Sequence, residues 1–136
     1  MKKHTLTWWK KKAKKTFQKW VRLRDADKHG FCKCCTCGTI KHWKKCDGGH
    51  FIPAEWLATC FIEHNCHSQC KSCNGFLEGN KDEYFIFMEK KYGRGTVDQL
   101  IQQKHLNIKY TYSDYSDIID LYTDKIIGLC KQKGIE

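Results

Sequence analysis

The sequence lacks several features that mark membrane-embedded, disordered or secreted proteins. It has one proline, Pro53, and no apolar run that reaches the ~18 residues of a membrane helix. With 29% charged residues and so little proline, a long disordered region is not expected in its 136 residues. The lysine-rich start is not followed by the apolar run of a secretory signal. We therefore expect one cytoplasmic domain that makes no contact with a membrane.

Acidic residues are scarce in the first third of the chain. Residues 1–45 hold fifteen Lys and Arg residues but only two acids, Asp25 and Asp27. Residues 46–93 hold four basic residues against seven acids, and residues 94–136 hold six of each. The net charge of +10 therefore arises at the N-terminal end. Such a localised basic block predicts a polyanionic partner, most simply nucleic acid.

The basic region is predicted to form an amphipathic helix over residues 7–27. One apolar stripe recurs at helical spacing: Trp9, Ala13, Phe17, Trp20 and Val21. The other faces carry the residues expected to contact phosphates: Lys10, Lys11, Lys14, Lys15, Lys19 and Arg22. Because no acid precedes Asp25 in this helix, phosphate contact is favoured over a solvated face that only keeps the chain soluble.

Ten cysteines are unexpected in a reducing cytoplasm, where disulfides are rare. Nine of them lie between Cys32 and Cys73, and this clustering is typical of metal binding. Two Cys-x-x-Cys pairs could together hold one tetrahedral Zn²⁺: Cys34 with Cys37, and Cys70 with Cys73. An overlapping Cys32–Cys35 pair leaves the register open, although Gly38 permits a tight turn directly after Cys37. Three further cysteines are expected to be small buried residues, with a second metal as the alternative: Cys46, Cys60 and Cys66.

Short strands are expected around Phe31–Cys35 and His50–Ile52. A helix should begin at Asn80, with Glu83 completing a capping box, and end before Gly93. Further helices are expected over residues 96–103 and 113–133. The last one has an apolar face that could pack within the chain or pair with a second copy: Tyr115, Ile118, Ile119, Tyr122, Ile126 and Leu129. Cys130 belongs to the same face and is expected to be a core thiol.

The segment between the cysteine pairs carries residues suited to phosphodiester hydrolysis. That reaction needs a base to activate water and a divalent cation to stabilise the developing charge. His50 suits the first task, and oxygen ligands such as Asp47 suit Mg²⁺. Asn65 could hold the histidine loop through backbone hydrogen bonds. As alternatives, His50 could be a zinc ligand or a buried structural histidine.

These residues also carry a family resemblance. The run His50–Pro53, then Asn65, then Cys70-x-x-Cys73 followed by Asn74, resembles HNH nucleases with a four-cysteine zinc site. The wider pattern covers about residues 17–95 and is similar to the NinG/Rap recombination proteins of lambda-like phages. Its further parts are Arg22-x-x-Asp25 before the cysteines and Gly79-Asn80-x-x-Glu83-Tyr84 after them.

The resemblance implies a small α+β fold, with a ββα-metal, treble-clef HNH-like zinc core over residues 28–93. A basic helix (1–27) and a helical extension (94–136) would complete one domain over residues 1–136. The implied activity is metal-dependent DNA endonuclease cleavage, selective for branched DNA such as Holliday junctions in phage recombination, in the host cytoplasm. The implied cofactors are structural Zn²⁺ and catalytic Mg²⁺ or Mn²⁺, and a homodimer would suit a junction.

The resemblance also implies residue roles. His50 becomes the general base, Asn65 the loop-positioning residue and Asn74 a ligand of the catalytic cation. The structural zinc ligands become Cys34, Cys37, Cys70 and Cys73. Many HNH nucleases have an Asp or His directly before the base, where this chain has Gly49. Asp47 or His67 could supply that ligand; otherwise Asp47 would cap a turn, and His67 would bond a thiolate or a phosphate.

Two other functions fit the sequence. One is a non-catalytic zinc module that binds nucleic acid as an adaptor in a recombination or repair assembly, which would not need His50, Asn65 and Asn74 together. The other is a zinc-finger-type protein-interaction domain whose lysines serve solubility. It predicts weak DNA binding that is indifferent to DNA structure.

Overall fold

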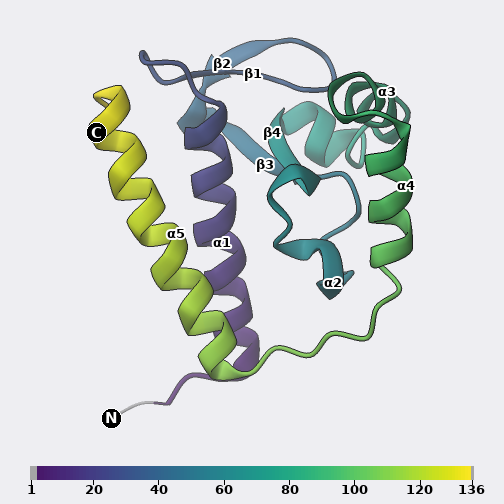
Figure 1. Ribbon diagram of the computed structural model, residues 1–136. Helices are drawn as coiled ribbons and strands as arrows, with labels where there is room; N and C mark the ends of the chain where they lie inside the picture. Colours follow the sequence, from purple (N-terminus) through teal and green to yellow (C-terminus); the bar gives the residue numbers. More distant parts are fainter. Residues whose placement is uncertain (1–2, 136) are drawn as a thin grey trace.

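The computed structural model describes residues 3–135, which form a mixed α+β fold with two small antiparallel sheets (Figure 1). The elements in chain order are α1 (Leu6–Asp25), β1 (Phe31–Lys33), β2 (Ile40–His42), η1 (Trp43–Lys45), β3 (Cys46–His50), α2 (Leu57–Cys60), η2 (Glu63–Asn65), β4 (Cys66–Cys70), η3 (Ser72–Phe76), α3 (Lys81–Tyr92), α4 (Arg94–Gln103) and α5 (Tyr112–Lys133). Within residues 3–135, no helix has the length and apolar character to cross a membrane.

Helix α1 confirms the predicted N-terminal helix, with its ends shifted by one or two residues. It begins after Thr5, whose Oγ1 accepts a hydrogen bond from the Trp8 N–H at 3.1 Å. Ala13, Phe17 and Val21 on its apolar stripe are fully buried. The stripe therefore holds α1 against the rest of the protein and leaves its basic residues on the other faces.

Helix α5 lies alongside α1 and runs in the same direction (Figure 1). Its Tyr115, Ile119 and Tyr122 are buried, so the face that could have paired with a second copy packs within the chain. Lys133 Nζ donates to the carbonyls of Leu23, Arg24 and Ala26 at 2.8, 2.8 and 2.7 Å. These bonds satisfy carbonyls at the C-terminus of α1 and place a positive charge at the negative end of its dipole.

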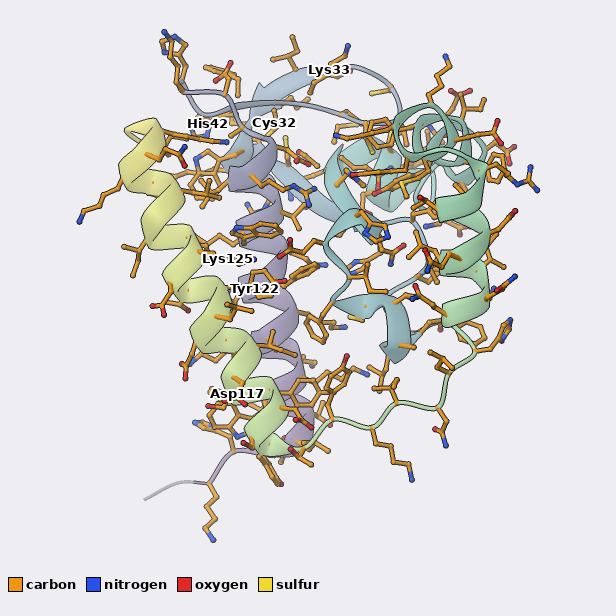
Figure 2. The ribbon with its side chains drawn as sticks, viewed as in Figure 1. Cys32, Lys33, His42, Asp117, Tyr122 and Lys125 are labelled. Carbon is orange, nitrogen blue, oxygen red and sulfur yellow. The ribbon has the colours of Figure 1, made fainter. Side chains whose placement is uncertain are left out.

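Two residues of α5 also hold the loop that precedes β4. Figure 2 shows Tyr122 and Lys125 between α5 and α1, and both donate to Glu63 Oε2, at 2.8 and 2.7 Å. Tyr122 packs on Trp20 and Phe17 of α1. The parallel helix pair thus supports one end of the β3–β4 hairpin.

The β3–β4 hairpin departs from the expected strand positions. Its register pairs Cys46 with Cys70 and His50 with Cys66. The strand expected over His50–Ile52 instead ends at His50, and Phe51 and Ile52 turn into a second core beneath α3 and α4. That core also contains Tyr84, Met88, Val97 and Leu100.

The capping box expected at the start of α3 is wrong. Asn80 is in the left-handed region (φ 48°, ψ 57°) and its side chain makes no cap hydrogen bond. The Asn80 amide instead donates to Cys73 Sγ at 3.6 Å, so a tertiary contact has replaced the local one. The predicted end of this helix is confirmed, because Gly93 follows Tyr92 with φ 89°.

Candidate functional site

The structure brings the four predicted zinc-ligating cysteines together. The sulfur atoms of Cys34, Cys37, Cys70 and Cys73 all lie within 4.8 Å of one another. Two thiolates on one tetrahedral zinc ion, each about 2.3 Å from it, would be about 3.8 Å apart. The Cys37 and Cys70 sulfurs are 3.7 Å apart. The cluster therefore fits a structural metal such as zinc.

Each of these sulfurs also has a polar neighbour that could support a thiolate. The neighbours are Thr36 Oγ1 at 3.3 Å from Cys34, Thr39 Oγ1 at 3.1 Å from Cys37, the Cys73 N–H at 3.4 Å from Cys70, and Asn80 Nδ2 at 3.6 Å from Cys73. Hydrogen bonds of this kind orient metal ligands and offset their negative charge. Burial raises the pKa of Cys34, but hydrogen bonds from the Thr36 hydroxyl and from nearby backbone N–H groups outweigh it and lower that pKa below its usual value.

The alternative Cys32–Cys35 register does not form. Cys32 is fully buried and donates to the Arg22 carbonyl at 3.1 Å, while Cys35 packs against the core under α3. Three other cysteines are buried, as expected: Cys46, Cys60 and Cys66. Within the described part of the chain, no second group of His, Cys, Asp or Glu side chains is close enough to hold a metal.

His50 is the last residue of β3 and is only 8% exposed. Its Nε2 lies 2.8 Å from the Cys60 carbonyl, which can only accept, so Nε2 carries the proton in the neutral ring. Nδ1 then holds the lone pair, and it makes only a long 3.9 Å contact with Cys66 Sγ. Burial, reinforced by the charges of Lys14 and Lys81, lowers the pKa of His50 to about 4 although the Cys60 bond opposes this. The ring is therefore a neutral proton acceptor at pH 7.

Asn65 closes the loop that supports His50. It is fully buried, and its Oδ1 accepts from the Ile52 N–H at 2.8 Å. Its Nδ2 donates to the carbonyls of Ile52 and Thr59, both at 3.0 Å. Because Cys60 directly follows Thr59, these bonds fix the backbone that orients the His50 ring.

Asn74 contacts Asp47 and also lines a cleft with His50. Asn74 Nδ2 donates to Asp47 Oδ2 at 3.0 Å, and Lys71 Nζ forms an ion pair with Asp47 Oδ1 at 2.8 Å. A cleft of about 260 Å³ is lined by His50 and Asn74, and one of about 410 Å³ by Asp47 and Asn74. The two clefts adjoin, with Gln18, Gly48 and Asn74 as their common border, and together they are called here the β3 groove.

The structure does not bring His67 to this groove. Its Nδ1 lies 3.1 Å from the Tyr84 hydroxyl and its Nε2 lies 2.6 Å from the Tyr92 hydroxyl, so both ring nitrogens are engaged. It lines a different cleft, with Arg24 and Lys91 among its neighbours. Burial lowers the pKa of His67 to about 3. In this arrangement the ring joins β4 to α3 and is not available to a cation.

Two of the predicted phosphate-contacting residues line the β3 groove. Lys15 and Arg22 do so from α1, together with Lys44 and Lys71 from other elements. Lys14 is close enough to His50 to lower its pKa, whereas Lys10 lines a separate cleft near Tyr110. Lys11 and Lys19 are exposed on α1 and do not line the groove. One wall of the groove is thus strongly basic.

Lys81 is a groove residue that the sequence reasoning missed. Its Nζ donates to the carbonyls of His50 and Phe51 at 2.6 and 2.8 Å, and it lines the cleft beside the His50 ring. Burial lowers its pKa. The sequence near Lys81 shows only that it begins a helix, α3. Its role in the groove could not be predicted from there, because both of its partners are about thirty residues away in the sequence.

Comparison with known proteins gives one family. The family model described as bacteriophage lambda NinG protein matches residues 1–132. No curated protein and no solved structure matches the chain.

Proposed function

The chain belongs to the bacteriophage lambda NinG family of phage recombination proteins, and on that premise we propose that it is a metal-dependent endonuclease that cuts branched DNA. The observation that carries this proposal is the β3 groove, in which Asn74 lines one cleft with His50 and the adjoining cleft with Asp47 and a basic wall. A groove with a proton acceptor, oxygen ligands and phosphate-binding cations contains the groups that phosphodiester hydrolysis requires.

In the proposed reaction, His50 Nδ1 takes a proton from the attacking water. The Cys60 carbonyl holds the proton on Nε2, which keeps Nδ1 as the acceptor throughout. The long contact with Cys66 Sγ leaves this acceptor without a strong partner before substrate binds. Asn65 acts through the loop that presents the Cys60 carbonyl, so it is a positioning residue.

Asn74 and Asp47 are the proposed ligands of a divalent cation, Mg²⁺ or Mn²⁺. Because Asn74 Nδ2 donates to Asp47, the Asn74 Oδ1 atom is the one left for a cation. Asp47 would exchange its ion pair with Lys71 for the metal, which frees Lys71 to contact a phosphate. When bound, the cation would stabilise the negative charge that develops on the phosphate and on the leaving oxygen.

Zinc has a positioning role in this proposal. Asn74 directly follows Cys73, and Cys70 ends the strand that pairs with β3. A zinc ion on the four cysteines would therefore tie the turn after β1 to the segment that carries Asn74. Removal of the zinc would therefore change the shape of the groove.

DNA would lie along the basic wall of the β3 groove. Lys15, Arg22 and Lys44 would contact phosphates, so binding should weaken steeply as salt is raised. The preference for branched DNA rests on the family, and the reaction would take place in the host cytoplasm.

The test is cleavage of a labelled four-way junction beside a matched linear duplex, by zinc-loaded protein in Mg²⁺, in Mn²⁺ or with no added divalent cation. Cation-dependent cutting should fall about 10²- to 10⁴-fold in His50→Ala. His29→Ala is the matched control, because His29 is an exposed histidine outside the groove. Equal cutting by His50→Ala and the wild-type chain would remove His50 from the mechanism.

A non-catalytic DNA-binding adaptor is the second candidate, and the burial of His50 favours it. A ring that is 8% exposed with a pKa of about 4 is a weak base and could serve only to join β3 to the loop. Tight junction binding by zinc-loaded protein without cutting in either cation would select the adaptor.

A further inference from the structure

Phe76 is an unusually exposed aromatic side chain beside the β3 groove. It is 87% exposed, more than any other exposed large apolar side chain among the described residues, and its neighbour Leu77 is 48% exposed. A single exposed apolar residue needs no special explanation. Two adjacent ones on the segment that also carries Asn74 form an apolar tip, called here the Phe76 tip.

Residues in and next to the Phe76 tip line two clefts. Asn74, Glu78 and Gly79 line the cleft that contains His50. Leu77 lines a second cleft of about 560 Å³, together with Lys41, Lys45 and Lys71. An apolar tip with lysines beside it suits a ligand that offers flat apolar faces between phosphates, which is the chemistry of DNA bases on their backbone.

The backbone holds the tip in one conformation. Successive hydrogen bonds run from Leu77 N–H to the Ser72 carbonyl at 2.9 Å and from Gly79 N–H to the Cys73 carbonyl at 2.8 Å. Glu78 and Asn80 both have left-handed φ angles, 52° and 48°, which non-glycine residues seldom adopt. Strained positions of this kind persist where surrounding contacts hold them, and they gather at functional sites. The tip is therefore ordered before any ligand binds.

We propose that Phe76, supported by Leu77, inserts at the branch point of DNA bound in the β3 groove and stacks on an exposed base there. This inference rests on the proposed function and adds a residue that discriminates between substrates. A base at a branch point has already lost part of its stacking, whereas insertion into a continuous duplex must first open a base step. The same contact therefore favours branched DNA over linear duplex.

The test uses the zinc-loaded full chain and a four-way junction with 2-aminopurine at the branch point, without added Mg²⁺ or Mn²⁺. The wild-type chain should change the fluorescence of this base on binding. Phe76→Ala should abolish the change and weaken junction binding at least about fivefold, with linear-duplex binding unaltered. Phe76→Trp keeps a stacking ring and should retain both effects. Ile127→Ala, at a residue 57% exposed on α5, is the control for removing an exposed apolar side chain.

The outcomes separate this inference from the proposed function. If Phe76→Ala binds the junction and changes the fluorescence as the wild-type chain does, the inference is overturned even where cutting persists. A fluorescence change that depends on Phe76 supports the stacking inference even where no variant cuts DNA. In that case only the endonuclease proposal fails. Zinc content and circular dichroism equal to those of the wild-type chain ensure that a loss of binding reflects the missing ring.

Discussion

The amide of Gln69 occupies the space that a side chain on Gly49 would need. A Cβ atom on Gly49 would overlap Gln69 Oε1. Gln69 is fixed there because its Nε2 donates to the Gly79 carbonyl at 2.9 Å and to Thr36 Oγ1 at 3.1 Å. The position before His50 therefore cannot carry a cation ligand in this fold, and Asp47, two residues earlier, is the nearest carboxylate on the same strand.

Gly49→Ala should destabilise the fold by about 1–3 kcal/mol, because the new methyl group must displace a buried and hydrogen-bonded amide. Urea unfolding at pH 7.5 measures this. Gly95→Ala is the matched control, since a Cβ there meets open space on a helix, and it should be neutral or slightly stabilising. Equal stability of the two variants would show that Gln69 moves aside at little cost.

Cys73→Ser should abolish zinc binding and reduce the ordered content of the β4–η3 region. It removes one of four sulfurs that lie within 4.8 Å of one another. Zinc stoichiometry and circular dichroism measure the two effects. Cys130→Ala removes a cysteine of α5 outside the cluster and should keep one zinc per chain. A zinc-loaded Cys73→Ser protein would contradict the four-cysteine site.

The contribution of His50 to stability should decrease as the pH falls from 7.5 to 5.5. Burial lowers its folded-state pKa to about 4, below its ordinary value of 6.5, so the unfolded chain takes up the proton first. The stability that the neutral His50 ring contributes is therefore fully present above pH 6.5 and is lost as the pH falls toward 4. The difference in unfolding free energy between the wild-type chain and His50→Gln should shrink over this range, because contributions from zinc and His67 are common to both. A constant difference would place the His50 pKa near its ordinary value.

Asp47→Asn should reduce cutting at low Mg²⁺ by at least about tenfold while preserving DNA binding, because it weakens a proposed cation ligand without removing a basic residue. A higher concentration of Mg²⁺ or Mn²⁺ should restore part of the cutting rate of Asp47→Asn. Asp82→Asn, an exposed acid in the first turn of α3, is the control and should leave the metal dependence unchanged. Cutting by Asp47→Asn with the metal dependence of the wild-type chain would limit the role of Asp47 to its ion pair with Lys71.

Patterns confined to a few neighbouring residues were predictable from the sequence. The apolar stripe of α1, the Cys-x-x-Cys spacing within each cysteine pair, and the end of α3 at Gly93 all depend on local spacing or on the freedom of one glycine. These elements appear in the structure with shifts of one or two residues at most.

Contacts between distant segments were not predictable in this way. Asn80 has the residue type of a helix cap, yet it bonds the Cys73 sulfur because the turn that carries Cys73 folds against it. His50 and His67 look alike as isolated residues, but the hairpin places one in the groove and the other between two tyrosines. Lys81 and Lys133 bond carbonyls about thirty and more than a hundred residues away.

The sequence alone determined the cysteine-rich segment that could hold a metal, the basic helix and the segment that carries His50, because zinc ligation and helical amphipathicity require fixed spacings along the chain. Only the tertiary structure decided which polar residues share a cleft, that α5 packs on α1, and that Phe76 stands exposed beside the groove. The physical reason is that burial and distance in space arise from the packing of all elements together, and no local spacing encodes them.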